Sequence, residues 1–198
     1  MRVTRLTHSC VRFQHDGRVL VVDPGVWSEA DVLADADAVL LTHEHTDHAD
    51  LERLRTAQVQ IVAPHDAVLP DVKVDAVGAG EAFTIAGFAI TAVGGVHAPV
   101  LPGQRPCANL GYVVEDAAYH TGEALHVPDV DVETLLVPMH GSWLTTSAAV
   151  EFIRRVGPRR AIGIHDGQIN DRGVMSVGHW LGSSAAVDYR WVPPGTDL

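Results

Sequence analysis

The sequence predicts an α+β fold in which two β-sheets pack face to face and helices cover both outer faces, a four-layer αβ/βα sandwich. Short runs of β-branched and apolar residues recur along the chain and are separated by turn residues. Each half of the chain closes with a segment of helical periodicity. Three strand-like runs end directly in histidine or acidic residues, which places polar side chains together at one rim of the packed sheets.

The first half is expected to open with a β-meander, because its first three apolar runs are short and the turn His15–Gly17 punctuates them. Ala38–Thr42 is apolar and too short for a helix, which predicts a strand buried on both faces. Leu51 and Leu54 are spaced among charged residues, which indicates a short helix over Asp50–Ala57. The expected strands of this half are Val3–Thr7, Val11–Gln14, Val19–Val22, Ala38–Thr42 and Gln58–Ala63.

The second half repeats this organisation with a longer series of strands. Gly94–Pro106 is rich in Gly and Pro and is expected to be a long, functional loop. An apolar stripe predicts an amphipathic helix over Thr146–Val156, ended by Gly157–Pro158, and a further helix is expected over Asp171–Leu181. The expected strands are Val72–Val77, Ala82–Ile85, Phe88–Val93, Leu110–Glu115, Leu135–Pro138, Ala161–Ile164 and Val187–Val192.

Composition limits the class of protein. A chain of 198 residues with a mean hydropathy of +0.10 fits one globular domain over residues 1–198. The formal charge of −11 would repel a polyphosphate backbone, so nucleic acid is not an expected partner. No apolar segment is long enough for a signal peptide or a membrane span, which favours a cytoplasmic protein acting on a small molecule.

The cysteines do not indicate a metal site, whereas the number of histidines does. Cys10 and Cys107 have no spacing typical of a disulfide framework or a thiolate metal site, and Cys10 is expected to be a small buried apolar residue. Twelve histidines in 198 residues are unusually many and direct attention to metal chemistry. The sequence does not predict an oligomeric state.

Four of the possible ligands lie in the string His43-Glu44-His45-Thr46-Asp47-His48. His43 and His45 are two residues apart, so in an extended segment both rings project to one side and can share one metal ion. Asp47 and His48 lie where the chain turns toward the next helix and offer ligands to an adjacent site. Zinc accepts both imidazole and carboxylate ligands.

This His-x-His-x-Asp-His string, together with the preceding run Val39–Thr42, resembles the signature of the metallo-β-lactamase superfamily. The resemblance covers nearly the whole chain, since Val21–Gly25 looks like the family's strand ending in aspartate. His97 and His165 match the positions of later ligands. The short length, Thr7–Cys10 and Ile164–Asp166 are most similar to the branch that contains L-ascorbate-6-phosphate lactonase. The resemblance implies a fold and a metal site, and it does not name a substrate.

The resemblance also implies how the ligands divide. One site would consist of His43, His45 and His97, and the other of Asp47, His48 and His165. The family's bridging carboxylate is usually an Asp after a Gly, and the matching residue here is Glu123, with His120 as a second candidate. One or two divalent ions are expected. Zinc is the first choice, and manganese and iron are alternatives.

The implied mechanism is hydrolysis by a metal-bound hydroxide of a small-molecule lactone, ester, amide or phosphate ester. Asp47 would also orient the hydroxide, and Asp23 is a candidate acceptor for a ligand histidine N–H. Further assignments are a substrate contact or proton donor at His8 and at His140, an anion partner at Arg105 and a wall of the cleft at Trp143. Surface positions are expected for His15, His65, His126 and His179.

Two other functions fit the same residues. One is redox chemistry at a single iron, as in the superfamily's thiol or persulfide dioxygenases. The other is a metal-binding module that has lost catalysis, with Glu123 as the sign of that loss. RNA processing, a further role in the superfamily, is disfavoured by the acidic balance of the chain.

Overall fold

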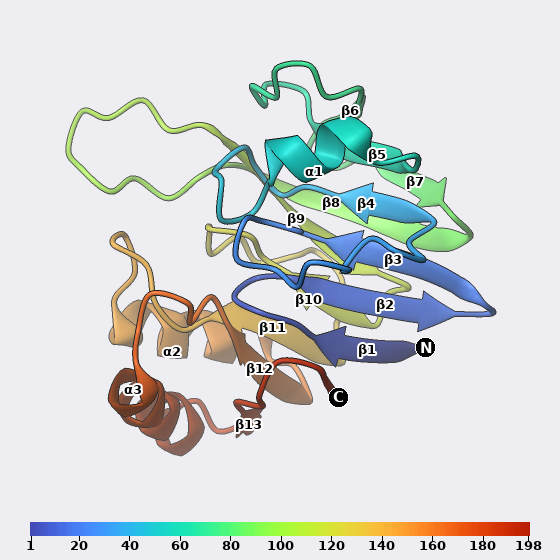
Figure 1. Cartoon of the computed structure of the whole chain (residues 1–198). Helices are drawn as coiled ribbons and strands as arrows, with labels where there is room; N and C mark the ends of the chain where they lie inside the picture. The colour runs from blue at the N-terminus through green and yellow to red at the C-terminus, as the bar shows by residue number, and fades with distance from the viewer.

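The computed structural model of the chain describes all residues, 1–198. Two seven-stranded mixed sheets pack against each other, with α1 on the outer side of one sheet and α2 and α3 on the outer side of the other (Figure 1). The predicted α+β sandwich of four layers is therefore confirmed. None of the helices combines the length and the hydropathy needed to cross a bilayer.

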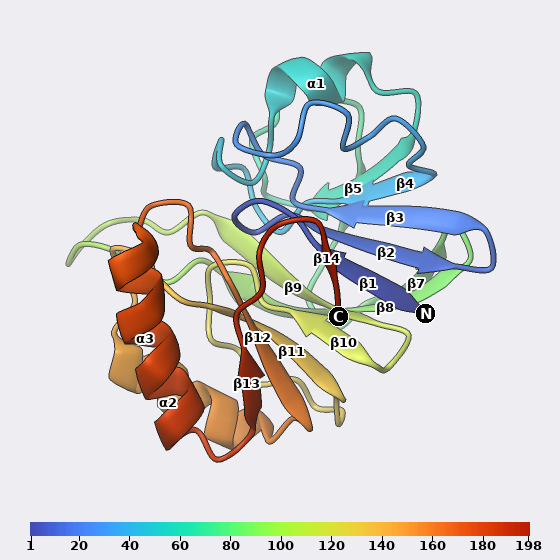
Figure 2. The same cartoon turned by 60° about the horizontal axis from the view of Figure 1, so that its bottom comes forward.

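The first sheet has the order β14-β1-β2-β3-β4-β5-β6. Its antiparallel part is the predicted meander, and β3, β4, β5 and β6 then run parallel to one another. The chain ends beside its beginning, because β14 pairs with β1 (Figure 2). The strands are β1 (Arg2–Arg5), β2 (Val11–His15), β3 (Arg18–Val22), β4 (Ala38–Leu40), β5 (Gln60–Pro64), β6 (Asp75–Val77) and β14 (Thr196–Asp197).

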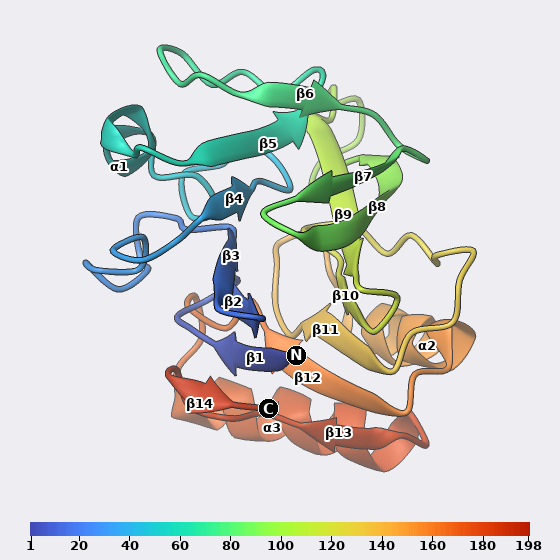
Figure 3. The ribbon, with the colours of Figure 1, turned by 90° about the vertical axis from the view of Figure 1, so that its right-hand side faces the viewer.

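The second sheet has the order β13-β12-β11-β10-β9-β8-β7. Hairpin strands β7, β8, β9 and β10 are antiparallel, whereas β10, β11, β12 and β13 are parallel. The two sheets face each other across the molecule (Figure 3). The strands are β7 (Ala82–Ile85), β8 (Phe88–Val96), β9 (Ala108–Val114), β10 (Ala118–His120), β11 (Thr134–Pro138), β12 (Arg160–Ile164) and β13 (Asp188–Arg190).

Alternation of side chains along buried strands separates the layers. In β11, Leu136 points into the core between the sheets, while Leu135 and Val137 point outward to α2 and α3. In β4, Leu40 lies in the central core, and Val39 belongs to the layer under α1. Strands buried on both faces read as continuous apolar runs, as the sequence predicts for Ala38–Thr42.

The helices begin and end at residues suited to those positions. Asp50 caps α1 (Leu51–Thr56), and Thr145 caps α2 (Thr146–Val156). Gly157 ends α2 in the left-handed conformation, with φ at +63°. Asn170 caps α3 (Asp171–Ser184), which is longer than predicted. These caps fix where each helix starts beside the rim that carries the histidines.

Several boundaries differ from the sequence prediction. β10 and β14 were not predicted, because both are short and carry polar residues that give no apolar run. β8 continues to Val96, since Gly94 and Gly95 pair with β9 despite lying in the Gly- and Pro-rich segment. β6 is confined to Asp75–Val77, shorter than the expected Val72–Val77. The loop proper is thereby reduced to residues 97–107.

Candidate metal centre

The fold brings strand ends from both sheets to one rim. His43 and His45 follow β4, and Asp47 and His48 lie in the turn that leads into α1. The remaining candidate ligands leave the second sheet just after β8, β10 and β12, and the loop after β8 extends from the same side of the molecule (Figure 1). They are His97, Glu123 and His165.

The candidate ligands form two adjacent groups. The first group consists of His43, His45, His97 and Glu123, and the second group consists of His8, Asp47, His48 and His165. Within each group, one ligand atom from every residue lies within 4.8 Å of the others. The rings of His43 and His48 lie 4.1 Å apart, so the two groups adjoin. Each group therefore offers several ligand atoms for a cation.

Hydrogen bonds fix the tautomers of three histidines. His43 Nδ1 lies 2.9 Å from the Thr42 hydroxyl, which itself donates to Asp23 and therefore accepts from the imidazole. His97 Nδ1 donates to the carbonyl of Ala98 over 2.6 Å. His48 Nδ1 donates to Asp23 Oδ2 over 2.7 Å, which confirms the expected role of Asp23. In each ring the proton is on Nδ1, and Nε2 presents a lone pair to the cluster.

Glu123 reaches both groups with its two carboxylate oxygens. Oε2 lies 2.7 Å from His97 Nε2, 3.2 Å from His43 Nε2 and 3.3 Å from His45 Nδ1. Oε1 lies 2.9 Å from His165 Nε2 and accepts a hydrogen bond from the Trp143 indole over 2.8 Å. The carboxylate of Glu123 therefore contacts histidines of both groups.

The donor atoms of this cluster fit a cation. His43 Nε2, His48 Nε2 and both ring nitrogens of His165 are buried and have no hydrogen-bond partner. With the proton on Nδ1, the Nε2 atoms of His43 and His48 each carry a lone pair that a carboxylate oxygen cannot satisfy. Because buried polar atoms are rarely left without a partner, bound cations are the groups that would satisfy them.

The protonation states favour metal binding. Burial lowers the pKa of His43 to about 3, so its imidazole is neutral at physiological pH. Burial alone would raise the pKa of Glu123, but its contacts with His165, His43, His45 and His97 outweigh that effect and keep it ionised. Neutral imidazoles and ionised carboxylates are the forms that ligate metals.

His45 differs from the other histidines of the first group. Its side chain is 44% exposed. Its Nε2 lies 3.7 Å from the Cys107 thiol, which leaves Nδ1 to face Glu123. Hydrogen bonds with Cys107 and with Glu123 raise the pKa of His45 to about 10 in the metal-free protein. An ion that binds at Nδ1 must therefore displace a proton.

His8 supports Asp47 within the second group. The backbone N–H of Gly167 donates to His8 Nδ1 over 3.0 Å, so the ring proton lies on Nε2 and is donated to Asp47 Oδ2 at 3.2 Å. Trp27 packs edge-on against the His8 ring at 4.8 Å. Burial lowers the pKa of His8 to about 4, which keeps it neutral. This tautomer makes His8 a hydrogen-bond donor to Asp47 and leaves no lone pair for a metal ion.

The backbone at the centre adopts conformations that few residues favour. His8, Asp23 and His165 have φ values of +62°, +52° and +59°, in the left-handed region. Such strain gathers at functional sites where the surrounding structure holds it in place. Gly25 is required for a different reason, because a Cβ there would lie 1.9 Å from the carbonyl oxygen of Asp47. Close backbone packing therefore fixes the turn that carries Asp47 and His48.

A cleft of about 670 Å³ adjoins the exposed edge of the first group. Arg105 is the one basic residue that lines it, and Glu44 and Asp66 are also part of its wall. Cys107 connects the cleft to His45. Trp143, expected only as a wall, contacts both Glu123 and the His97 ring, the latter at 6.3 Å between ring centroids.

Other expectations have mixed outcomes. His140 follows β11 and belongs to neither group, and its buried Nδ1 has no hydrogen-bond partner. His15, His65 and His179 are exposed as predicted, whereas His126 is half-buried beneath β8, where its Nε2 meets the carbonyl of Val96. Arg5 is wholly buried and was not singled out from the sequence. Its position two residues after the inward-facing Val3 is the signal that could have revealed it.

Comparisons with known proteins agree with this geometry. Residues 2–165 match the family model described as the beta-lactamase superfamily domain. The protein Rv0786c of Mycobacterium tuberculosis is 33% identical over 177 residues, which is 83% of this chain and 84% of that protein. These matches establish the superfamily, and they do not extend to the branch that contains ascorbate-6-phosphate lactonase.

Solved structures share the fold at low sequence identity. Igni18, a metallo hydrolase from Ignicoccus hospitalis, superimposes with a TM-score of 0.75 at 17% identity and covers 100% of this chain and 97% of its own. CmlA, a diiron β-hydroxylase from Streptomyces venezuelae, gives 0.74 at 15% identity, with 100% of this chain and 53% of CmlA covered. At such identities the likeness concerns the fold alone. Because the family model spans most of the chain and the fold and candidate ligands agree with it, this protein belongs to the metallo-β-lactamase superfamily.

Proposed function

We propose that the protein is a metal-dependent hydrolase of a small-molecule lactone, ester, amide or phosphate ester. The observation that carries this proposal is Glu123, whose two oxygens face histidines of both groups. When bound, divalent ions would supply an activated water molecule and polarise the carbonyl or phosphoryl group that is attacked. Zinc is the expected metal because imidazole nitrogens and carboxylate oxygens are its preferred ligands, and manganese and iron are alternatives.

The protein's own residues would hold and orient the reacting groups. His43, His45 and His97 would bind one ion, and Asp47, His48 and His165 would bind the other, with Glu123 between them. His8 holds Asp47 Oδ2 through its Nε2–H, which leaves Oδ1 to contact an ion or accept a proton. Trp143 restricts the rotation of Glu123 by donating to Oε1. Buried ligands exclude bulk water from most of the centre.

The substrate would approach from the side of His45, the most exposed ligand of the first group. The adjoining cleft is large enough for a metabolite-sized molecule, and Arg105 could pair with an anionic substituent there. The acidic side chains of Glu44 and Asp66 would disfavour a polyanion. Lactones and phosphate esters of small metabolites are therefore the first substrates to test, lactones because of the resemblance to the ascorbate-6-phosphate lactonase branch.

The test is a substrate panel with defined metals. Protein stripped with a chelator and reloaded separately with zinc, manganese or iron would be assayed against lactone, ester, amide and phosphate ester substrates, with His43→Ala as the inactive control. We expect turnover that requires a metal and is lost in the variant. Metal binding without turnover of any substrate would instead favour a binding module. Stoichiometric iron with thiol-dependent oxygen uptake would favour the dioxygenase.

A further inference from the structure

Arg5 in β1 is an unusual residue for the interior, because its side chain is wholly buried. Its guanidinium forms an ion pair with Asp166, donates from Nε to the carbonyl of Gly163 over 3.2 Å and donates from Nη1 to the carbonyl of Val192 over 3.0 Å. The planar fork of arginine makes all these contacts at once, which lysine could not do. Arg5 therefore ties β1 to the end of β12 and to the C-terminal segment.

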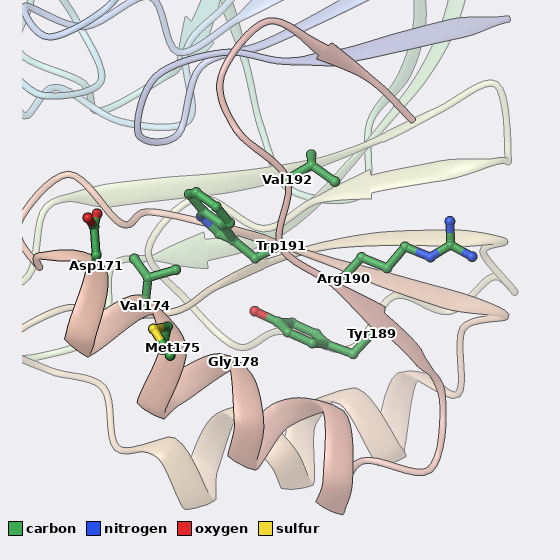
Figure 4. A pocket seen from close by; sticks show the side chains of 8 residues that line it. All are labelled: Asp171, Val174, Met175, Gly178, Tyr189, Arg190, Trp191 and Val192. Carbon is green, nitrogen blue, oxygen red and sulfur yellow. The ribbon is translucent and has the colours of Figure 1, made fainter.

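Asp166 is held at both carboxylate oxygens. Arg5 contacts Oδ1, and the Trp191 indole donates to Oδ2 over 2.6 Å. The Arg5 guanidinium also lies 5.4 Å from the Trp191 ring, so the three side chains form one clamp. Trp191 borders a hollow of about 720 Å³ between α3 and β13, beside Tyr189 and Val192 (Figure 4).

The clamp acts on the segment that carries His165. His165 is in the left-handed conformation, and the one polar contact of its ring is the 2.9 Å approach of Nε2 to Glu123 Oε1, so its position depends largely on its backbone. Gly163 and Asp166, on either side of it, are the residues that Arg5 contacts. Few other polar contacts direct this imidazole toward the centre.

The same segment also positions the rest of the second group. His165 N–H donates to the carbonyl of His8 over 3.0 Å, and Gly167 N–H donates to His8 Nδ1 over 3.0 Å. His8 in turn donates to Asp47. A continuous series of contacts thus leads from Arg5 and Trp191 through Asp166 to His165, His8 and Asp47. None of these contacts involves the histidines of the first group.

We propose that Arg5, Asp166 and Trp191 are positioning residues that set the affinity of the second group for its metal ion and leave the first group unaffected. The proposal rests on the proposed function because it requires an ion at each group. Outer contacts of this kind orient ligands and commonly change metal affinity by about 10- to 100-fold. It assigns a specific role to three residues that touch no candidate metal position.

The most direct variant is Trp191→Phe, which removes the hydrogen bond to Asp166 Oδ2 and keeps an aromatic ring beside Arg5. The smaller ring enlarges a hollow that is already open, so the variant is expected to fold. Asp166→Asn is the second variant and removes the charge that faces Arg5. Trp180→Phe is the matched control, because Trp180 is 56% exposed on α3 and has no contact with the clamp.

Cobalt titration followed by visible absorption would measure two dissociation constants, and calorimetry would give the thermal midpoint of each metal-free variant. We expect the affinity of the second group for cobalt to fall by about tenfold in Trp191→Phe and by about 100-fold in Asp166→Asn. The affinity of the first group should change by less than about twofold. The control should match the wild type at both ions. Hydrolysis need not be measured, so this test is independent of whether the substrate class is right.

Three results would overturn the proposal. One is an unchanged cobalt affinity of the second group in both variants. Another is a loss of affinity that is equal at the two ions and follows the fall in thermal midpoint, which would mean that the clamp serves only general stability. The third is binding of a single ion by the wild type, since no second ion would then exist to be positioned. Two bound ions without hydrolysis of any substrate would contradict the proposed function and leave the role of the clamp intact.

Discussion

Two of the three histidines of the first group have a hydrogen-bond partner at the adjacent position in the chain, whereas the second group depends on contacts between turns far apart in the sequence. Thr42 and Ala98 fix the rings of His43 and His97 from the adjacent position in the chain. His165, in contrast, has no such partner and is held through its backbone. The two groups therefore differ in how their side chains are held, the first mainly by adjacent residues and the second by residues far away in the sequence.

The comparison extends to solvent and charge. The first group opens to the cleft through His45, while His8, His48 and His165 of the second group are buried to 1% exposure or less. Asp23 serves both groups, because its carboxylate accepts from His48 Nδ1 and from the Thr42 hydroxyl that contacts His43. The first group is thus partly accessible to solvent and held mainly by adjacent residues, whereas the second group is buried and held by residues distant in the sequence. We expect the first group to tolerate perturbation of the turns and the second to be sensitive to it.

The largest effect is expected where the two groups share a residue. Glu123→Gln keeps the shape of the side chain and removes the charge that faces four histidines. Both metal ions should bind at least about 100-fold more weakly, since even outer contacts account for about 10- to 100-fold. Isothermal titration calorimetry with zinc would measure this. Equal loss at both groups supports a bridging role, and loss at only one would restrict Glu123 to that group.

A smaller effect should separate the groups. Gly25→Ala places a Cβ 1.9 Å from the carbonyl oxygen of Asp47 and pushes the turn that carries Asp47 and His48. Overpacking of this kind destabilises by about 1–3 kcal/mol, which corresponds to about 2–4 °C in thermal midpoint for each kcal/mol. The second ion should weaken more than the first in a cobalt titration. Equal weakening of the two ions would contradict the distinction between the groups.

Gly182→Ala provides the control for that variant. An added Cβ at Gly182, on an exposed position of α3, meets only Tyr189 Cδ1 at 3.6 Å. Replacing a helical glycine by alanine stabilises by about 0.5–1 kcal/mol. Its thermal midpoint should rise slightly, and both metal affinities should equal those of the wild type.

The smallest effect concerns the exposed edge of the first group. Cys107 and Glu123 raise the pKa of His45 to about 10, so at neutral pH the first ion must displace a proton and its affinity should rise with pH. The metal-free protein has the opposite dependence, because stability from protonated His45 is complete below pH 6.5 and is lost as the pH rises through about 10. Cys107→Ala should therefore increase the affinity of the first group for its ion several-fold at pH 7 and make that affinity less dependent on pH. Titrations between pH 6.5 and 9 check this, and an unchanged slope would exclude the thiol as the cause.

The same contrast explains what the sequence could predict. The string His43–His48 is contiguous, and its spacing alone predicted that His43 and His45 share one side of the chain and that Asp47 and His48 lie in the turn that follows. The buried strands β4, β11 and β12 were predictable because their apolar runs are continuous. β10 was missed because Ala118–His120 is short and its pairing with two neighbours, not its composition, makes it a strand.

Roles that depend on distant contacts could not be derived from local sequence pattern, and Glu123 was named only through the resemblance to the family. Glu123 reaches both groups only because its backbone is anchored to the Asn109 side chain over 2.8 Å and Gly122 turns with φ at +61°. The tautomer of His8 is fixed by Gly167, which lies 159 positions further along the chain. Arginine usually lies at the protein surface, but Arg5 is buried in the core. Such properties arise from tertiary structure and leave little trace in local sequence pattern.

Anomalous diffraction from crystals grown with zinc tests the central claim most directly, because it locates each ion and identifies its ligands. We expect two peaks, one bound by His43 Nε2, His45 Nδ1 and His97 Nε2 and the other by Asp47, His48 and His165, at about 2.0–2.2 Å from their ligand atoms and with Glu123 contacting both. An absence of zinc between these side chains at saturating concentration, or ligation of zinc by other residues, would contradict the account.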